Sequence, residues 1–424
     1  MTPGSIPGAP TASERYHAAV DYLFPRTTTI KFGLERIERL LGVLGDPHRV
    51  VPSIHIGGTN GKGSVSTMVA SVLQAAGWRV GLYTSPHLVD FRERITVNGV
   101  PISEAAVALW TERLREEIEA SEATFFEAST AIAFADLAAR GAEIAVIEVG
   151  LGGRLDSTNI VRPLVSGVTK IAIDHQKYLG ETIELIAREK AWIAKPGAPF
   201  VIGERDPAVV SVLREEAQRA VASLAPDARA DIRVLPPEYE WHGPLGLRGA
   251  HQRRNAGVAH GILMALPAPY RPDPRALEAG LAAAFIPGRL DRRGRWLFDV
   301  AHNPDGVRSL VQAIDELDPP RPIHALVSIL GDKEWPEMLV ELDQAVDRGI
   351  LTVAPTALGR RWDLDWLRKW LDRPDRPPAR AEWKLVEDFP AALEEVGQAA
   401  GTILVTGSFH TVGDVMAALG FSPI

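Results

Sequence analysis

The sequence of 424 residues contains no cysteine and no long apolar run. The absence of cysteine excludes disulfide bonds, thiolate metal sites and cysteine nucleophiles, and it is compatible with a reducing compartment. No segment reaches the ~18 consecutive apolar residues typical of a transmembrane helix, and the N-terminal segment lacks the charged start and apolar core of a secretory signal. We therefore expect a cytoplasmic protein without a membrane partner.

Lysine and net positive charge are also scarce. The formal net charge is −8, which provides no broad basic surface for a nucleic acid, so no nucleic-acid partner is expected. Only nine of the 46 basic residues are lysines. A lysine beside a candidate site is then harder to explain as a surface residue, which draws attention to Lys62 and Lys190.

The alternation of apolar runs and helical stretches predicts an α/β protein. With 46% hydrophobic residues the chain can bury sizeable cores, and its length suits two or three domains. Short β-branched runs alternate with helical stretches from Val50 onward, which is typical of parallel sheets covered by helices. The predicted strands include 80–83, 144–147, 165–173, 200–202, 296–299, 324–329, 350–353 and 403–406, and the predicted helices include 64–74, 255–266 and 274–284.

Three irregular segments organise the chain. Residues 1–15 are rich in Pro, Gly, Ser and Thr and are predicted to form a loose tail. Residues 236–253 lose the periodic pattern and suggest a small excursion or a hairpin. Pro287-Gly288-Arg289 breaks the chain before a second series of strands and helices. We expect a parallel-sheet domain over 1–287, followed by a smaller Rossmann-like α/β domain over 288–424.

One glycine-rich segment, Gly58-Thr59-Asn60-Gly61-Lys62-Gly63-Ser64, has the composition of a phosphate-binding loop. It follows the strand end Ile54-His55-Ile56 and precedes a packed helix, so backbone N–H groups at the helix start can face an anion. Lys62 can neutralise phosphates, and Ser64 can reach a bound Mg²⁺. The spacing is shorter than in the general P-loop pattern and indicates a variant of it. The alternative is a glycine-rich turn that holds no ligand.

Polar residues follow three of the predicted strands. Ligands of open α/β sheets bind beyond the carboxyl ends of the strands, and Ser85, Glu148 and the pair Asp174-His175 occupy such positions. A hydroxyl, a carboxylate and phosphate oxygens suit Mg²⁺, whereas histidine is a less usual ligand for this ion. Each side chain alone also fits a capping or solvated group. Their occurrence together, downstream of the phosphate loop, favours a nucleotide and metal site.

Six motifs occur in order along the chain. They are the phosphate loop at 58–64, Thr84-Ser85-Pro86-His87, Phe126-Glu127, Glu148-Val149-Gly150-Leu151-Gly152-Gly153, Asp174-His175 and Asp299-Val300-Ala301-His302-Asn303-Pro304. Together they resemble folylpolyglutamate synthase and dihydrofolate synthase, a branch of the Mur ligases, from about Thr29 to Gly413. The resemblance implies an ATP-dependent ligase that forms amide bonds in a cleft between two domains, the first of them a P-loop-containing parallel-sheet ATPase domain over 1–287.

The resemblance implies roles for individual residues. Those that would hold ATP are Asn60, Gly61, Lys62, Gly63 and Ser64 on one side of the cleft, and Asn255, Arg289 and Asp299 on the other. Those that would bind Mg²⁺ are Ser85, Glu148 and His175. Lys190 would be carbamylated, so that its new carboxylate reaches a second Mg²⁺. With Lys62 and Lys190, His302 is the third candidate catalytic residue, and it would help to place glutamate or the reaction intermediate.

A pterin site is also implied by the resemblance. Its residues would be Thr124, Phe125, Phe126, Glu127, Leu155, Asp156 and Ser157, with a further stretch at Thr29-Ile30-Lys31-Phe32. An aromatic pair can stack on a flat pterin ring, and carboxylates can accept hydrogen bonds from its N–H groups. Core packing is the alternative for the two phenylalanines. The chain departs from the family pattern at Trp192, where a small residue is expected, and at Gln176-Lys177-Tyr178, where Thr or Ser is more usual.

The expected reaction adds L-glutamate to folates, with dihydropteroate as a further candidate acceptor. ATP would phosphorylate the substrate carboxylate, and the amine of glutamate would then displace phosphate. The motifs do not distinguish the two acceptors. The expected partners are ATP, two Mg²⁺ ions, L-glutamate and the pterin substrate, and we expect a monomer.

Two other functions are considered. A peptidoglycan-type Mur ligase carries a separate domain before its phosphate loop, and the 57 residues that precede Gly58 are too few for it. A nucleotide-dependent switch of the GTPase type would need an Asn-Lys-x-Asp segment, and no lysine of this chain follows an asparagine. Both alternatives are therefore disfavoured.

Overall fold

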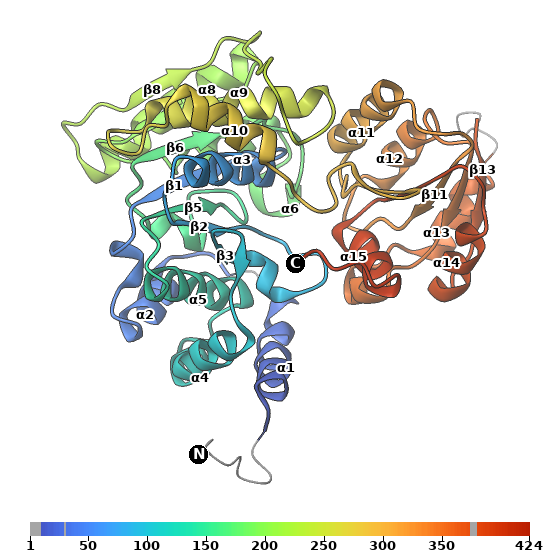
Figure 1. The fold of residues 1–424 in the computed structure, drawn as a ribbon, viewed down its shortest axis with the longest axis horizontal. Coiled ribbons are helices and arrows are strands. Elements are labelled where there is room, and N and C mark those ends of the chain that lie inside the picture. The colour runs from blue at the N-terminus through green and yellow to red at the C-terminus, as the bar shows by residue number, and fades with distance from the viewer. Residues whose placement is uncertain (1–9, 29–30, 374–379) are drawn as a thin grey trace.

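The computed structural model describes residues 10–28, 31–373 and 380–424 and divides them between two β-sheets (Figure 1). The larger sheet has eight strands and the smaller has six. Helices cover both faces of each sheet, so the predicted α/β class with a smaller C-terminal domain is confirmed. Within the described ranges, no helix is both long and apolar enough to cross a bilayer.

The eight-stranded sheet is parallel except at one edge. Its strands follow the order β4-β3-β2-β5-β1-β6-β7-β8, and the pairs β2–β3 and β3–β4 are antiparallel. The strands are β1 (Ser53–Gly57), β2 (Val80–Tyr83), β3 (Ile95–Val97), β4 (Val100–Pro101), β5 (Ile144–Glu148), β6 (Val165–Val168), β7 (Pro199–Ile202) and β8 (Asp231–Val234). Because β1 is central, the loop that follows it meets the loops after β5 and β6 at one edge of the sheet.

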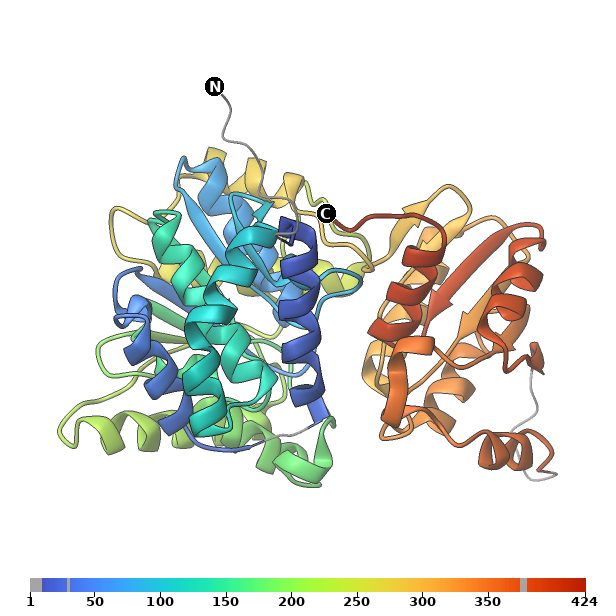
Figure 2. The same cartoon turned by 90° about the horizontal axis from the view of Figure 1, so that it is seen from below.

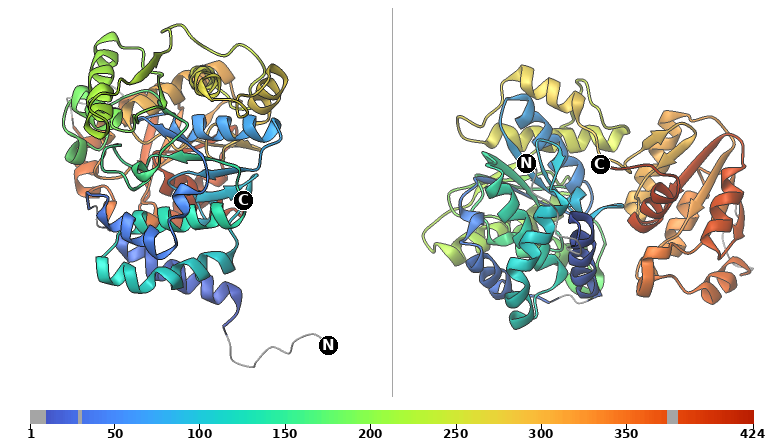
Figure 3. Two further views of the ribbon diagram at one scale, coloured as in Figure 1. Left: turned by 90° about the vertical axis from the view of Figure 1, so that its left-hand side faces the viewer. Right: turned by 60° about the horizontal axis from the view of Figure 1, so that its bottom comes forward.

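Helices pack on the two faces of this sheet, as the left view of Figure 3 shows. They are α1 (Ala12–Leu23), α2 (Glu35–Val43), α3 (Lys62–Ala75), α4 (Glu104–Ser121), α5 (Phe125–Ala139), α6 (Gln176–Leu179), α7 (Ile183–Ala191), α8 (Pro207–Leu224), α9 (Ala250–Ala265) and α10 (Pro274–Ala283). Ile54 and Ile56 of β1 pack with α3, α9 and α10, whereas α1, α2, α4 and α5 form the core of the opposite face. Since side chains alternate along a strand, His55 points away from Ile54 and Ile56, toward that opposite face.

The six-stranded sheet lies beside the first, and Figure 2 shows the two domains side by side. Its order is β13-β12-β11-β14-β10-β9, with β9–β10 the antiparallel pair. The strands are β9 (Asp291–Arg293), β10 (Trp296–Phe298), β11 (Ile323–Val327), β12 (Arg348–Leu351), β13 (Glu382–Leu385) and β14 (Thr402–Thr406). The helices are α11 (Pro304–Leu317), α12 (Trp335–Leu342), α13 (Leu364–Leu371), α14 (Phe389–Gly397) and α15 (Phe409–Ala418). The chain enters this sheet between α10 and β9, and the boundary after residue 287 stays a prediction.

Most predicted strands are found with ends shifted by two residues or fewer, but three predictions were wrong in part. The strand expected over 165–173 ends at Val168, because the next residues turn to the phosphate loop: the Thr59 N–H donates to the Lys170 carbonyl at 2.8 Å. The tail expected over 1–15 gives way to α1 at Ala12, which Thr11 and Glu14 cap. The segment 236–253 contains no strand and joins α9 at Ala250, so it is not a hairpin.

The prediction missed β3, β4, β8, β9 and β13. These strands are short. β8 and β13 lie at the edges of their sheets, and no residue of either is buried. Edge strands bury little apolar surface, so they carry a weak hydrophobic pattern.

Candidate active site

A single cleft of about 1470 Å³ is lined by residues of both domains. Its walls include the phosphate loop, the ends of β2 and β5, the segments after β6, and the starts of α11 and α15. Pockets for one small ligand usually measure 300–1,000 Å³. This cleft can therefore hold more than one substrate at once.

The phosphate loop joins β1 to α3 through two glycines with positive φ. Gly58 has φ +136°, and a Cβ there would lie 1.9 Å from Thr169 Oγ1. Gly61 has φ +93° at the N-cap of α3, and a Cβ there would lie 2.5 Å from Asn255 Oδ1. Only glycine fits both positions. The loop therefore exposes the first N–H groups of α3 to the cleft, as the sequence predicts.

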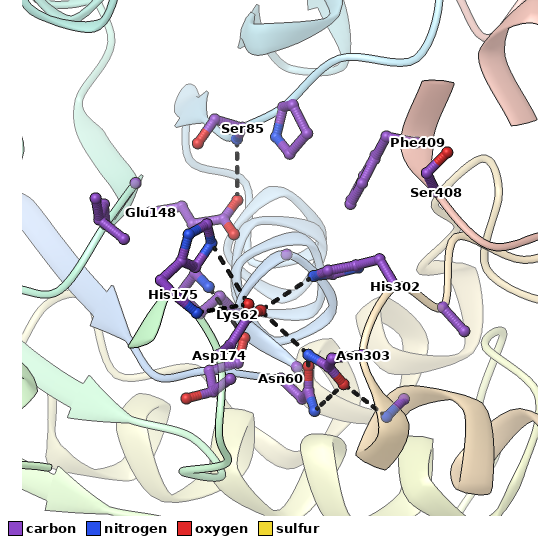
Figure 4. Close-up of a pocket in the computed structure, with 18 of the residues that line it drawn as sticks. Asn60, Lys62, Ser85, Glu148, Asp174, His175, His302, Asn303, Ser408 and Phe409 are labelled. Atoms are coloured by element: carbon purple, nitrogen blue, oxygen red, sulfur yellow. Dashed lines mark hydrogen bonds and ion pairs between the residues drawn. The ribbon is translucent and has the colours of Figure 1, made fainter. Parts of the chain in front are cut away.

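Lys62 lies at the first position of α3 and is enclosed by the cleft walls (Figure 4). Its Nζ donates to the Thr59 carbonyl at 3.1 Å and forms no ion pair within 4.0 Å among the described residues. Burial lowers the pKa of Lys62, whereas the nearby charge of Glu148 acts in the opposite direction. A partly buried cation with only a carbonyl as its hydrogen-bond partner can accept a ligand of negative charge.

Glu148 and Ser85 end two neighbouring strands, β5 and β2. The Ser85 N–H donates to Glu148 Oε2 at 3.2 Å, and Glu148 is 4% exposed. Burial raises the pKa of Glu148 to about 7, and the charge of Lys62 opposes this rise. A carboxylate has about four lone-pair sites, so Glu148 retains acceptor capacity toward the cleft.

Asp174 and His175 lie on the same side of the cleft as Lys62 (Figure 4). His175 has φ +53°, and its backbone N–H donates to Asp174 Oδ1 at 2.8 Å. Burial lowers the pKa of His175 to about 3, so the imidazole is neutral and able to act as a ligand. Burial disfavours the charged form of Asp174, but hydrogen bonding to His302 and the positive charge of Lys333 hold its pKa below the usual range.

Lys190, near the end of α7, is 4% exposed and contacts the phosphate loop. Its Nζ donates to the Gly58 carbonyl at 2.8 Å. Burial, and next the positive charge of Lys62, lower the pKa of Lys190 to about 7. The structure thus brings this lysine to the site, although it lies 128 positions after Lys62.

The C-terminal domain reaches the phosphate loop through Asn303 and Asp305 at the start of α11. Asn303 Nδ2 donates to Asn60 Oδ1 at 3.0 Å and to Asp174 Oδ2 at 3.2 Å, and Asn60 Nδ2 donates to Asp305 Oδ2 at 2.8 Å. Asp305 also pairs with Lys170. The side chain of Asn60 is therefore turned toward the second domain.

His302 and Lys333 approach Asp174 from the C-terminal domain as well. His302 Nε2 lies 3.5 Å from Asp174 Oδ2, and its Nδ1 lies 2.9 Å from the Val300 carbonyl. Lys333 forms an ion pair with Asp174 in which each side chain is 6% exposed. No role is predicted from the sequence for Lys333, Asn303 or Asp305. For Lys333 two signals were present, because lysine is scarce in this chain and Lys333 lies shortly after β11.

Asn255, Arg289 and Asp299, expected to bind ATP, line the same cleft. Asn255 lies against Gly61 and donates through Nδ2 to Gln252 Oε1 at 3.0 Å. Arg289 is placed over the Phe409 ring at 5.4 Å. Asp299 accepts the N–H groups of Leu290 and Ala301, both at 3.0 Å, so its carboxylate also shapes the turn between β10 and α11.

The predicted pterin residues divide into two groups. Those that line the cleft are Lys31, Phe32, Thr124, Phe125, Phe126, Leu155, Asp156 and Ser157, whereas Thr29 and Ile30 lie outside the described residues. Glu127 is 2% exposed and does not line the cleft. Its carboxylate caps α5 through Thr124 and accepts from Arg36 Nε at 2.8 Å. Glu127 therefore orients Thr124 and the start of α5 from behind the wall.

Phe125 and Phe126 serve the core and the cleft together. Phe125 contacts Phe24 at a ring-centroid distance of 5.3 Å, and the Arg94 guanidinium lies 5.1 Å from its ring centre. Phe126 packs against Gly150, where a Cβ would lie 2.3 Å from its Cζ. The core-packing alternative and the pterin-site prediction are therefore compatible.

Comparisons with known proteins agree with this geometry. The Mur ligase middle domain matches residues 56–243, and the Mur ligase glutamate ligase domain matches residues 288–409. The dihydrofolate synthase/folylpolyglutamate synthase of Mycobacterium tuberculosis is 36% identical, over 95% of this chain and 93% of its own. A probable bifunctional folylpolyglutamate synthase/dihydropteroate synthase of Haloferax volcanii is 34% identical over 94% of this chain, which spans 50% of that protein.

Solved structures show the same arrangement. Mycobacterium tuberculosis folylpolyglutamate synthase complexed with ADP superposes with a TM-score of 0.84 at 32% identity, covering 98% of this chain and 100% of that one. A bifunctional folylpolyglutamate synthase/dihydrofolate synthase with Mn, AMPPNP and L-glutamate bound gives a TM-score of 0.79 at 30% identity, over 97% of this chain and 99% of its own.

Proposed function

From the premise that this chain belongs to the folylpolyglutamate synthase/dihydrofolate synthase family of Mur ligases, we propose that it joins L-glutamate to dihydropteroate and to reduced folates, forming ADP and phosphate. Membership of this family makes the chain an ATP-dependent ligase that uses a divalent metal ion. The two acceptors and the roles of individual residues are our proposal. A monomer in the cytoplasm stays a prediction.

One observation carries the proposal. Lys62, Glu148, His175 and Lys190 come from four separate segments of the chain, and all four line the cleft beside the phosphate loop. Figure 4 shows the first three of them. His302 and Asn303 of the other domain lie across from them. This arrangement suits a triphosphate on one side and an acceptor carboxylate and amine in the space between the domains.

The reaction follows from the weak reactivity of carboxylates. An acceptor carboxylate attacks the γ-phosphorus of ATP, the bond to ADP breaks, and an acyl phosphate forms. The amine of glutamate then attacks the acyl carbon, phosphate leaves, and the amine loses a proton. Lys62 and the N–H groups of the phosphate loop balance the negative charge that develops on the transferring group. Contact between the domains at Asn60 and Asn303 excludes water from the acyl phosphate.

Ser85, Glu148 and His175 fit a divalent cation. Glu148 accepts the Ser85 N–H and keeps free lone pairs, and His175 is a neutral imidazole. Among the described residues no group of three His, Cys, Asp or Glu forms a metal site alone, so the remaining ligands would come from the serine hydroxyl and the substrates. A bound cation would neutralise phosphate charge and hold the γ-phosphoryl group in line.

Lys190 is proposed to be carbamylated. Its amine, with a pKa of about 7, is partly neutral at physiological pH and can attack CO₂, forming an N–C bond and losing a proton. The product carries a negative charge beside Lys62, so a repulsive pair becomes an attractive one. A ¹³C NMR carbamate signal should appear with labelled bicarbonate and be absent from Lys190→Met. A parent protein without this signal would overturn the assignment.

The acceptor and glutamate are proposed to occupy opposite parts of the cleft. Thr124, Phe125, Phe126, Leu155, Asp156 and Ser157 would surround the pterin, with Glu127 supporting Thr124 from behind. The opposite wall contributes Arg360 and His410, whose cationic or hydrogen-bonding groups suit the carboxylates of glutamate. His302 lies between the two parts, where it can orient the attacking amine.

The test is an assay of ADP release. Dihydropteroate and tetrahydrofolate are supplied separately, each with ATP and Mg²⁺ and with or without L-glutamate. We expect release with both acceptors, and dependence on glutamate in each case. Equal release without glutamate, or none with either acceptor, would reject the proposed function. Lys384→Met removes an exposed lysine far from the cleft lining and serves as the matched control for changes at Lys62.

A further inference from the structure

A chain of buried polar groups lies behind the part of the cleft wall that carries Asp156. Asp156 is 5% exposed and faces the cleft, whereas Thr158 and His55 are fully buried behind it. Thr158 belongs to the short 3-10 helix Ser157–Ile160, and His55 is the middle residue of the central strand β1. Neither residue lines the cleft, and the reaction described above makes no use of either.

The hydrogen bonds of this chain run in one direction. Thr158 Oγ1 donates to Asp156 Oδ1, which also accepts the Thr158 N–H at 2.9 Å. His55 Nε2 lies 2.8 Å from the same Thr158 Oγ1. The ionised carboxylate can only accept, so the threonine proton points to Asp156 and His55 must donate from Nε2. The order is therefore His55 to Thr158 to Asp156.

The other carboxylate oxygen is held from the cleft side of the loop. Asp156 Oδ2 accepts the Leu151 N–H at 2.7 Å. Donors from Thr158, Leu151 and the backbone of Gly150 thus fix the plane of the carboxylate, and Asp156 lines the cleft. Burial raises the pKa of Asp156, while these donors act in the opposite direction and favour the charged form. The orientation of Asp156 depends on Thr158.

The series of hydrogen bonds ends at His55, at its other ring nitrogen, Nδ1. His55 Nδ1 has no hydrogen-bond partner in the described part of the protein, and neither has Oγ of Ser166, its register partner on β6. Burial, and next the charge of Lys195, lower the pKa of His55 to about 3. A neutral imidazole with an Nε2 proton is therefore the stable form, which is the form that donates to Thr158.

We propose that Thr158 and His55 are positioning residues that hold Asp156 as a hydrogen-bond acceptor for the N–H groups of the pterin ring. This inference rests on the proposed function, because it assigns the substrate that Asp156 recognises. It concerns the acceptor alone. In the proposed function ATP and glutamate bind elsewhere in the cleft, so their recognition does not depend on the hydrogen bonds from His55 to Asp156.

The experiment compares four proteins: the parent, Thr158→Val, Thr158→Ser and Ser166→Ala. Valine keeps the shape of threonine and removes the hydroxyl, so we expect the KM for dihydropteroate to rise about tenfold, as for loss of a hydrogen bond to a charged group. We expect kcat and the KM for ATP to change less than twofold. Serine keeps the hydroxyl and should restore the parental KM. Ser166→Ala removes a buried hydroxyl beside His55 that belongs to no hydrogen bond, and it should match the parent.

Each outcome decides the matter. A parental KM for dihydropteroate in Thr158→Val overturns the role of the hydroxyl, as does a raised KM in Thr158→Ser. Equal increases in the KM values for ATP and dihydropteroate indicate a general loss of structure and also overturn the proposal. If Thr158→Val does not fold, Thr158→Ala takes its place, with the same expected rise in the KM for dihydropteroate alone. If the parent uses neither pterin acceptor, the proposed function fails and this inference fails with it.

Discussion

Charged side chains have different kinds of partner on the two sides of the cleft. On the eight-stranded side, Lys190 and Glu148 are buried and Lys62 is partly buried, and their hydrogen-bond partners are backbone groups of Gly58, Ser85 and Thr59 in turn. At the contact between the domains, Asp174 is equally buried but pairs with Lys333, and Asp305 pairs with Lys170.

This difference distinguishes charges that can bind a ligand from charges that hold the two domains together. A buried charge without a counter-charge costs free energy, and the cost is recovered when a ligand of opposite charge binds. A buried pair carries its own counter-charge and needs no ligand. We infer that the first set awaits phosphates and cations, whereas the second set holds the two domains together around them.

The largest effect is expected at Lys62. Lys62→Met should lower kcat/KM for ADP release about a thousandfold, because the variant lacks the cation that balances the transferring phosphoryl group. The free energy of unfolding without nucleotide should stay the same or rise by about 1 kcal/mol, since a desolvated charge is removed. Urea unfolding and the ADP assay measure the two quantities, with Lys384→Met as the control. A variant that is both active and destabilised would break the comparison.

A paired residue should behave in the opposite way. Asp174→Asn leaves Lys333 buried without a counter-charge, and we expect the free energy of unfolding to fall by about 3 kcal/mol. Lys333→Met should reduce it as well, and the double variant should recover about 2 kcal/mol relative to the sum of the two losses. Urea unfolding of all four proteins at neutral pH gives this coupling. Strict additivity would show that the ion pair does not hold the domains.

His55 offers a test of a buried group that stays neutral. Its pKa is lowered from 6.5 to about 3, so below pH 6.5 the unfolded chain binds a proton that the folded protein does not. Stability should therefore fall with acidification, by about 1.5 kcal/mol from pH 6.5 to pH 5. His55→Leu should lack this part of the slope, whereas His17→Leu, at an exposed position, should keep it. Parallel pH profiles for all three proteins would contradict the expectation.

The smallest effect is expected at Lys170. Its side chain is 50% exposed and that of Asp305 is 17% exposed, so water screens the pair. Lys170→Ala should lower the free energy of unfolding by less than about 1 kcal/mol, and the difference should shrink in 1 M NaCl. A loss as large as that of Asp174→Asn would show that exposure does not rank these contacts.

Much of the fold could be predicted from local sequence patterns. The central strands β5 and β14 contain continuous apolar runs, and the glycine spacing and the single lysine of the phosphate loop are local signals as well. The edge strands β8, β9 and β13 could not be predicted in this way, because they bury too little to need an apolar pattern. The early end of β6 also escaped prediction, since its cause is a contact with Thr59 more than a hundred positions away.

The site divides along the same line. Lys62, Glu148 and His175 could be found from their positions after apolar strands, and the resemblance to a family added Lys190 and the pterin residues. Glu127 shows the limit of such reasoning, because the motif that contains it also describes a helix cap, and the structure places its carboxylate behind the wall. The hydrogen bonds from His55 to Asp156 had no sequence signal, since a histidine inside a strand is also an ordinary core residue.

The sequence by itself determined which segments become strands and helices, where the glycines permit a phosphate loop, and which side chains can carry chemistry, because these depend on residues a few positions apart. Only the tertiary structure decided which charges are paired. Whether Asp174 meets Lys333, or Lys190 meets Gly58, depends on how two sheets bring distant segments together, and burial then sets which protonation state each group prefers.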